Sequence, residues 1–465
     1  MKKQALTLAL LICSWMAMAQ TSYPPYDFKV ANVDGDTLYY RITSSSAPYT
    51  VAVTRCMDSA FHTLHVPHTA FDVGQPGYAY PLYNYDSLIT IPSEVSYNGI
   101  TYSVSAIDNE AFYFQWGIRK VILPTAVTTI DTAAFYLSSL SEIVMPGVQQ
   151  ILFGAFYSTP LEQVELPQTL TYMGNSVFAG THLREVDIPS GVTELLGRTF
   201  LSAPLEHIIF HEGLEIIHDM AFSCNRIDTL IFPSTLQFLG KLSDYLAGSY
   251  TPSYALKYVK FKEGTLPLEL GDYCMAYMDS LSELLLPDNV VEFGENCFLL
   301  SGLPSVTIPS RVTSIPQGCF QGCDSLKEIV VRNPIPLSLG LYAFPQTENI
   351  RVVIPCHSIE NYENSPDWSN YENFSFVEDC VGVEETDKTM IRIWPIPVHN
   401  RMYVSSSNNP IHYIEMYDAC GHRMFYMQST DNQIIINTSK IPRGMYYLRL
   451  VDSKEYIHTF KVAKN

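Results

Sequence analysis

A motif that recurs at intervals of 21 or 22 residues in most of its copies constrains the fold of this 465-residue chain more than any other feature. In its first clear copy, Val121 to Pro124 is followed by Val127, Ile130 and the pair Ala134-Phe135. One such unit is too short to bury its own apolar side chains, so units must stack and share a core. The chain is therefore predicted to form a solenoid. The position of Pro124 recurs at Pro146, Pro167, Pro189, His211, Pro233, Pro287, Pro309 and Pro355.

Within each unit, the apolar, variable and apolar residues before the proline predict a short strand. Alternate side chains of a strand point to opposite faces, so the first and third residues are expected to face inward and the middle one outward. The proline ends the strand because it has no N–H to donate. The following apolar pair is expected to return the chain over the core. Phe135 is expected to stack on Phe156 and Phe178 in a buried spine of rings.

The full pattern, with Ile or Val, a variable residue, Ile or Leu, Pro, and later Ala-Phe, resembles the BspA-type leucine-rich repeat of bacterial surface proteins. The resemblance covers residues 26–380. Residues 26–28, 37–42 and 95–104 are similar to the usual lead-in of that family. Residues 353–355, Tyr362 and Trp368 are similar to its last repeat and cap. The family resemblance implies a leucine-rich-repeat solenoid with short parallel strands.

The pattern departs from the family twice. Asp244-Tyr245-Leu246 replaces Ala-Phe within the stretched segment 240–265, and Arg332 occupies a proline position. Both departures are interpreted as insertions or loops on one edge of the solenoid.

The N-terminus has the features of a secretory signal peptide. Basic residues at Lys2 and Lys3 precede an apolar stretch, and Ala17-Met18-Ala19 predicts cleavage between Ala19 and Gln20. No transmembrane segment is expected after this cleavage, because no later apolar run is long enough. The formal net charge of −19 disfavours nucleic acid as a partner.

The period stops after Cys380, and alternating apolar residues with turns predict a small Ig-like β-sandwich. Residues 394–397, 416–421, 441–448 and 460–462 are similar to the type A C-terminal sorting domain of type IX secretion, with Pro-Ile-Pro in place of Pro-Asn-Pro. This resemblance implies export by the type IX secretion machinery, removal of the module, and attachment of the new end to surface lipopolysaccharide. An ordinary Ig-like binding module is the alternative.

The predicted fold is thus mostly β, with a β-rich N-terminal lead-in cap, a leucine-rich-repeat solenoid and a C-terminal Ig-like β-sandwich. The expected domains are a signal peptide at 1–19, an N-terminal β lead-in at 20–85, BspA-type repeats with their C-terminal cap at 86–380, a linker at 381–389 and a sorting domain at 390–465.

Outward residues of the predicted strands form the candidate ligand face. They mix acidic side chains with exposed Ile, and an apolar patch rimmed by charge is typical of interaction surfaces. The alternative is an ordinary sheet surface, whose β-branched residues serve strand propensity. The candidate residues are Glu142, Glu165, Glu185, Asp187, His207, Ile209, Ile231 and Tyr258.

Nine cysteines remain after removal of the signal peptide, an odd number that leaves at least one thiol unpaired. Cys356 and Cys380 bracket the capping segment and are predicted to form a disulfide, with two unpaired thiols as the alternative. Cys297 and Cys319 occupy the same position in successive units, with Cys274 near that position in the unit before. A ladder of buried structural thiols is therefore expected.

Other groups of polar residues have simpler interpretations. His62, His65 and His68 would need another ligand to hold a metal, so a solvated cluster is expected. The segment Asn32 to Asp36 predicts a hairpin turn, since it has no terminal Glu of a calcium loop. No motif of a catalytic nucleophile, zinc protease or phosphate loop occurs in the sequence. The sequence thus predicts no catalytic residue, no metal and no cofactor.

The combined features predict a protein that is secreted or attached to the outer surface through its processed C-terminus. The predicted function is binding of a macromolecular ligand, as an adhesin or a binder of a host extracellular protein. A glycan-binding accessory protein and an enzyme with a shallow site on the solenoid are the alternatives.

Overall fold

The computed structural model describes residues 26–55, 85, 87–222, 226–242, 255–346, 349–380, 391–394, 397–398, 400–406, 410–418, 422–453 and 457–464. The predicted signal peptide with its Ala19–Gln20 site, the three histidines at 62–68, residues 244–246 and the linker at 381–389 lie outside these residues. The chain divides into two compact units. One unit is Met1–Val353 with Glu360–Phe376, and the other is Ile354–Ile359 with Val377–Asn465.

The chain enters the first unit through an antiparallel hairpin, β1 (Phe28–Ala31) and β2 (Thr37–Ser44), as the turn residues predicted. The side-chain oxygen of Asn32 accepts hydrogen bonds from the backbone N–H groups of Asp34 and Asp36, at 3.1 and 2.8 Å. Gly35 adopts the φ of +92° that this turn requires. Strand β3 (Thr50–Thr54) follows and pairs in parallel with β6 (Ile100–Ile107), which also carries β5 (Glu94–Tyr97). The lead-in thereby joins the repeats as one sheet.

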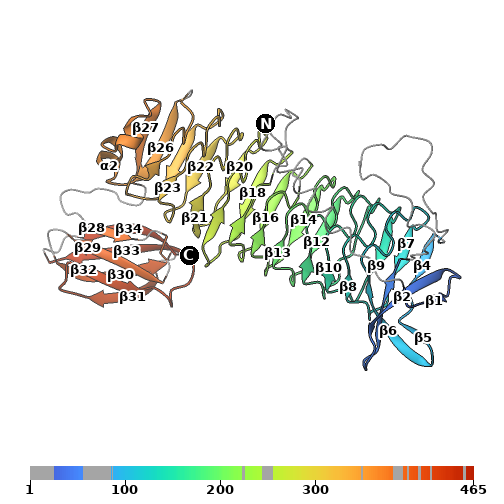
Figure 1. Cartoon of the computed structure of the whole chain (residues 1–465). Helices are drawn as coiled ribbons and strands as arrows, with labels where there is room; N and C mark the ends of the chain where they lie inside the picture. The colour runs from blue at the N-terminus through green and yellow to red at the C-terminus, as the bar shows by residue number, and fades with distance from the viewer. Residues whose placement is uncertain are drawn as a thin grey trace. The chain divides into compact units, whose positions relative to one another are not determined.

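The predicted solenoid is confirmed, with successive coils stacked side by side (Figure 1). The strands before the proline positions form a first strand row, in the sheets β4-β7-β9, β12-β14, β16-β18-β20 and β22-β24-β26-β27. Apolar residues such as Val121 and Val186 point inward from these strands and are buried. The strands of this row are β4 (Leu88–Thr90), β7 (Lys120–Ile122), β9 (Glu142–Val144), β12 (Glu185–Ile188), β14 (His207–Phe210), β16 (Thr229–Phe232), β18 (Tyr258–Phe261), β20 (Glu283–Leu285), β22 (Ser305–Ile308), β24 (Glu328–Val331), β26 (Ile350–Pro355) and β27 (Phe374–Asp379).

One unit lacks the strand that its sequence predicted. Residues 161–167, which include Glu165, form no strand, so the first strand row is interrupted between β9 and β12. In the preceding unit, Ser139 donates its backbone N–H to the carbonyl of Gln115 at 3.0 Å. Pro160 occupies the equivalent position and has no N–H to donate. Pro204 occupies the same position before β14, which still forms a strand, so the missing hydrogen bond accompanies the interruption but does not by itself cause it.

The return over the core, which the sequence predicted without a strand, is itself a second strand row. Each coil contributes two to four residues to it, and neighbouring strands pair in parallel. Side chains such as Ile130 and Ile151 face inward from this row and are fully buried. Its strands are β8 (Thr129–Ile130), β10 (Gln150–Ile151), β11 (Tyr172–Met173), β13 (Glu194–Leu195), β15 (Ile216–Ile217), β17 (Phe238–Leu239), β19 (Leu268–Leu270), β21 (Val290–Phe293), β23 (Ser314–Ile315) and β25 (Ser338–Leu339).

The predicted spine of phenylalanine rings is confirmed at the core. Phe135 stacks on Phe156 with ring centroids 5.4 Å apart, and Phe156 stacks on Phe178 at 5.2 Å. Backbone hydrogen bonds between coils keep the rings aligned. For example, the backbone N–H of Phe135 donates to the carbonyl of Ala155 at 2.8 Å. Cys274, Cys297, Cys319 and Cys323 are fully buried in the repeats, as the ladder of small thiols predicted.

Glycines after the second strand row allow close approach of neighbouring coils, a role that the sequence analysis did not assign. A Cβ on Gly294 would lie 2.4 Å from the backbone nitrogen of Asp272 in the preceding coil. A Cβ on Gly240 would lie 2.8 Å from the backbone nitrogen of Asp219. Neither glycine has a positive φ, so the requirement is steric rather than conformational.

We expect Gly294→Ala to reduce the stability of the solenoid by about 1–3 kcal/mol, because the backbone of the preceding coil must move. Thermal unfolding of the purified chain, followed by circular dichroism, measures the change. Gly197→Ala is the control, since the nearest atom to its added Cβ is the carbonyl oxygen of Asp219 at 3.2 Å. Equal melting temperatures for the Gly294 variant and the unmodified chain would contradict the steric role.

A cap closes the last coil, with two short helices, α2 (Ile359–Glu363) and α3 (Pro366–Ser369), between β26 and β27. Tyr362 and Trp368, the residues that resembled the family's cap, are fully buried. The indole N–H of Trp368 donates to the carbonyl of Leu337 at 2.8 Å. A disulfide joins Cys356 and Cys380.

We expect the Cys356–Cys380 disulfide in the mature exported protein, where it closes a loop with a sequence separation of 24 residues. A closed loop of this size stabilises a fold by about 3 kcal/mol in the chain-entropy model. Mass spectrometry of the non-reduced protein should find the two cysteine peptides linked. Alkylation of both sulfurs without a reductant would contradict the bridge.

The second unit contains the predicted β-sandwich, with sheets β28-β29-β32 and β31-β30-β33-β34. The strand pairs within both sheets are antiparallel. Side chains from both sheets, among them Met402, Ile414 and Leu448, form one buried core. The strands are β28 (Ile391–Trp394), β29 (Arg401–Ser406), β30 (Ile411–Asp418), β31 (Arg423–Gln428), β32 (Gln433–Asn437), β33 (Gly444–Asp452) and β34 (Ile457–Lys464).

Candidate ligand-binding face

The candidate ligand face is built on the outward residues of the first strand row. Strand β12 pairs with β14 so that Glu185 lies opposite His207 and Asp187 lies opposite Ile209. These side chains are exposed, while Val186 between the two acids is buried. Parallel strands lie about 4.8 Å apart, so each outward residue has a close neighbour on the next coil.

Exposed aliphatic side chains recur along this face. Ile209 on β14 is 43% exposed and Ile231 on β16 is 48% exposed. Val144 on β9 and Leu285 on β20 are exposed to a similar degree. Burial of a large aliphatic side chain lowers the free energy, so burial of these side chains under a ligand can stabilise a complex.

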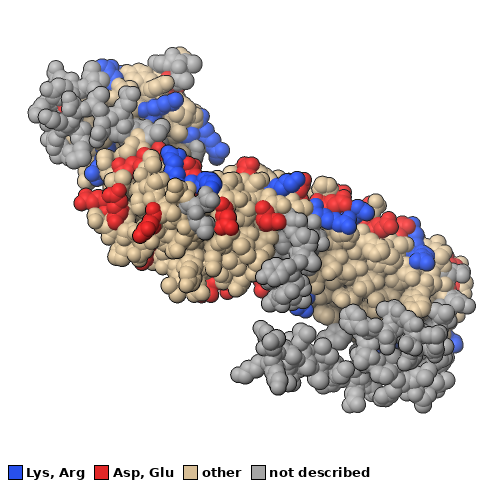
Figure 2. Space-filling view, turned by 90° about the horizontal axis from the view of Figure 1, so that it is seen from above, with Lys and Arg blue, Asp and Glu red and all other residues tan. Residues whose placement is uncertain are grey.

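Some of the charged side chains beside the aliphatic ones are paired. Asp187 accepts a hydrogen bond from Nε2 of His211 at 2.6 Å, because His211 replaces the proline of its unit. Lys120 and Glu142 form an ion pair at 2.5 Å. Figure 2 shows acidic and basic side chains among one another on one side of the molecule. The paired charges of the candidate face can help to orient a ligand.

Glu212 is the acid near this face whose pKa is shifted. Burial acts to raise its pKa, but hydrogen bonds from Lys262 and Ser234 outweigh burial, and the pKa lies below the usual value. The carboxylate accepts hydrogen bonds from Nζ of Lys262 at 3.0 Å and from the hydroxyl of Ser234 at 2.8 Å. Glu212, as an anion, therefore links its own coil to the next two coils.

Most of the predicted residues lie on the first strand row, but the row is interrupted at two places between them. Glu165 is exposed but lies in the interrupted segment, so it is not on a strand. Ile209 and Ile231 belong to different sheets, β12-β14 and β16-β18-β20. Tyr258 on β18 is half-buried, opposite Thr229 of β16. Glu142, Glu185, Asp187, His207, Ile209 and Ile231 all lie on strands of the first row.

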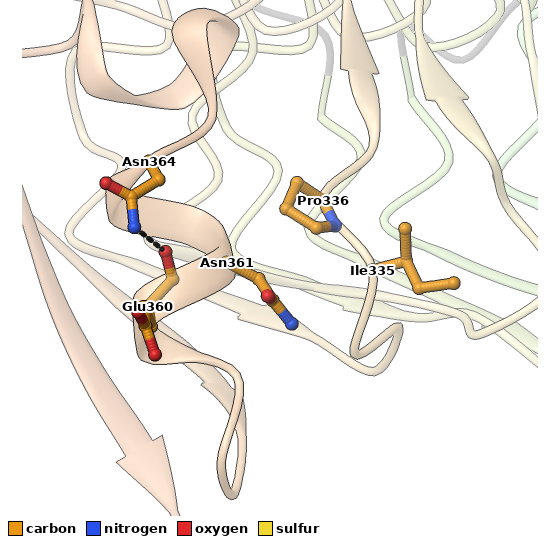
Figure 3. A pocket seen from close by; sticks show the side chains of 5 residues that line it. All are labelled: Ile335, Pro336, Glu360, Asn361 and Asn364. Carbon is orange, nitrogen blue, oxygen red and sulfur yellow. Dashed lines mark hydrogen bonds between the residues drawn. The ribbon is translucent and has the colours of Figure 1, made fainter.

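Two open hollows lie away from the candidate face. The first, of about 590 Å³, lies between the turn at Ile335-Pro336 and helix α2, with Asn361 facing that turn (Figure 3). The second, of about 320 Å³, lies on the second strand row beside Phe238, Glu269 and Glu292. Sequence reasoning missed the second hollow because it did not predict that these residues lie in register on adjacent strands.

Among the cysteines that the structure describes, Cys319 and Cys323 are buried thiols with low reactivity. Burial raises the pKa of Cys323 to about 11, and burial also raises the pKa of Cys319. Such thiols remain protonated and are poor nucleophiles and metal ligands. In the part of the chain that the structure describes, one cluster with metal-binding residue types occurs, Cys356, Glu378 and Cys380. Both of its sulfurs are in the disulfide, so they cannot act as thiolate ligands.

Comparison with protein families decides the nature of the repeats. Residues 91–153, 149–243 and 249–366 match the BspA type leucine-rich repeat region, in six copies. The chain belongs to the BspA-type leucine-rich repeat family. Residues 392–464 of this BspA-type protein match the secretion system C-terminal sorting domain. No curated protein sequence matches the chain.

Solved structures of similar proteins include a leucine-rich cell surface protein from Faecalibacterium prausnitzii. It is 20% identical with a TM-score of 0.40, and the match covers 77% of this chain and 97% of that one. A leucine-rich repeat protein from Bacteroides ovatus is 22% identical with a TM-score of 0.33, covering 76% of this chain and 100% of that one. The pneumococcal vaccine antigen PcpA is 18% identical with a TM-score of 0.34, covering 77% and 100%.

The sorting domain makes this BspA-type protein a secreted or outer-surface protein. Among the residues that the structure describes, no helix has the length and apolar character of a membrane span.

Proposed function

We propose that the BspA-type solenoid binds a protein ligand through its first strand row, as an adhesin or a binder of a host extracellular protein. The observation that carries the proposal is the row of exposed aliphatic residues, Ile209 and Ile231, flanked by paired charges on rigid strands. Protein interfaces combine such an apolar centre with a polar rim. The two described hollows contain no residue of this row, so binding to a broad surface fits it better than enclosure of a small molecule.

The C-terminal sandwich acts in export in this proposal and is not part of the ligand site. The type IX secretion machinery recognises it, the module is removed after crossing the outer membrane, and the new end is attached to the surface or released. The match of residues 392–464 to a sorting domain supports this role.

A glycan is the second candidate ligand, because three tyrosine rings line up on successive coils. Tyr136 stacks on Tyr113 with centroids 5.4 Å apart and on Tyr157 at 4.7 Å. All three rings are half-buried. Burial raises the pKa of Tyr136, with a further contribution from Tyr157, so its phenol remains a neutral hydrogen-bond donor.

Binding of the secreted mature protein to purified extracellular-matrix proteins and to a glycan array tests the proposal and its alternative. Saturable binding to one matrix protein, with no signal on the array, is expected. Binding to glycans alone would replace the protein ligand by the second candidate. Turnover of an array member without stable binding would instead indicate an enzyme.

A further inference from the structure

The sheet β31-β30-β33-β34 of the sorting domain has a core face and an outer face. Leu448 and Leu450 of β33 point into the sandwich core with Ile414 of β30. The alternate residues of the same strands therefore form the outer face. Two rows of side chains cross it in register, Arg423-Tyr417-Tyr447 and Tyr426-Glu415-Arg449, and we refer to these six residues as the aromatic–basic face.

The one acidic residue of this face, Glu415, is paired with groups of the same domain. The side chain of Glu415 is 9% exposed. Its carboxylate accepts hydrogen bonds from the guanidinium groups of Arg423 at 3.0 Å and Arg449 at 3.4 Å. The hydroxyl of Tyr417 donates to the same carboxylate at 2.9 Å. Burial acts to raise the pKa of Glu415, but hydrogen bonds from Tyr417 and Arg423 and the charge of Arg449 outweigh it and lower the pKa. Glu415 thus holds two guanidinium groups in fixed positions on the surface.

The rest of the aromatic–basic face is exposed and apolar or positive. Tyr426 is 46% exposed and Tyr447 is 44% exposed. The guanidinium of Arg423 lies 5.2 Å from the centroid of the Tyr426 ring, which holds both groups in place. Lys461 of β34 lies opposite Tyr447 and is exposed. Tyr and Arg are the residues that most often dominate the binding energy of protein interfaces.

The charge of this part of the chain is opposite to that of the whole. Residues 390–465 hold 9 Lys and Arg against 5 Asp and Glu, whereas the whole chain has a net charge of −19. Arg423, Arg449 and the neighbouring Lys461 outnumber the one acid, Glu415, so this surface has a positive net charge and attracts an acidic partner.

We propose that the aromatic–basic face docks the sorting domain onto an acidic protein surface of the secretion machinery, an inference that rests on the export role proposed above. The exposed rings of Tyr426 and Tyr447 favour a protein over an anionic membrane, because Tyr together with Arg dominates the binding energy of protein interfaces.

The variant Tyr426→Ser, Tyr447→Ser, Lys461→Glu tests this proposal in the full-length chain, expressed in the bacterium that makes it. The groups that donate to Glu415 are those of Tyr417, Arg423 and Arg449, so the internal network keeps its partners in this variant. We expect the amount of protein on the surface and in the medium to fall about tenfold, as after loss of an interface hot spot. The protein should accumulate in the periplasm. Lys461→Arg should export normally, because it retains the charge.

The control variant changes the outer side of the other sheet, with Tyr403→Ser, Ile435→Ser and Arg401→Glu. Tyr403 lies opposite Ile435 there, so the control removes a comparable aromatic, apolar and basic set. Thermal unfolding of the purified chains checks that both triple variants fold. If the face variant does not fold, Lys461→Glu alone replaces it, and a reduced export is still expected.

Normal export of the folded face variant, while deletion of residues 383–465 blocks export, would overturn the docking face and leave the sorting role intact. Normal export after the deletion would overturn the sorting role itself. Equal losses in the face and control variants would also overturn the proposal. Vesicles of phosphatidylglycerol and phosphatidylcholine are the probe for the lipid alternative. If the full-length chain binds these vesicles, and the face variant loses this binding but is exported normally, the face binds lipid instead.

Discussion

Deletion of residues 383–465 should leave the chain in the periplasm, whereas the full-length chain should reach the surface or the medium. The deleted module has its own core, formed by residues such as Met402 and Leu448, so its removal takes no core residue from the repeats. The sorting-domain match at residues 392–464 is the reason to expect loss of export rather than loss of ligand binding. Fractionation of the bacterium with immunoblotting measures the outcome.

Processing gives this experiment a second readout. If the module is removed during export, the full-length chain should lose about 9 kDa, at roughly 110 Da per residue for a module of domain size. The solenoid triple variant described below is the control, since it leaves the sorting domain intact and should export normally. Equal amounts of truncated and full-length protein outside the cell would mean that the sandwich is a resident domain that helps to bind ligand.

The variant Glu185→Lys, Asp187→Lys, Ile209→Ser should weaken ligand binding about tenfold or more without unfolding the solenoid. Glu185 and Asp187 are adjacent outward residues of β12, and Ile209 is directly opposite Asp187 on β14. All three are exposed, so the core contacts of the coil are kept. Binding to the ligand found in the matrix or array screen, measured by surface plasmon resonance, gives the change in Kd.

A matched control places the same changes on the second strand row, as Glu269→Lys, Glu292→Lys and Ile216→Ser. Glu269 and Glu292 are adjacent outward acids there, and Ile216 is half-buried on β15. The control variant should bind as the unmodified protein does. Unchanged binding in the first-row variant would remove this face from the proposal, and loss in the control alone would move the ligand to the second row.

The sequence by itself determined the solenoid and its core. The Ala-Phe pair recurs at a fixed interval, so Phe135, Phe156 and Phe178 must fall at equivalent places in stacked coils, where the structure has them. The apolar alternation after residue 390 likewise determined a sandwich. Such features follow from local pattern, because burial of apolar side chains depends on their spacing along the chain.

Only the tertiary structure decided which residues become neighbours across coils. The second strand row forms because hydrogen bonds between coils align short segments such as Thr129–Ile130 and Gln150–Ile151, whose own patterns are too short to predict a strand. The interruption at Glu165 is seen only in the tertiary structure, because the apolar pattern of residues 161–167 is the same as in the neighbouring units. The aromatic–basic face depends on the register of three strands around Glu415. Register and contacts between distant segments are set by the whole fold, whereas the period of the apolar residues can be read from any one unit.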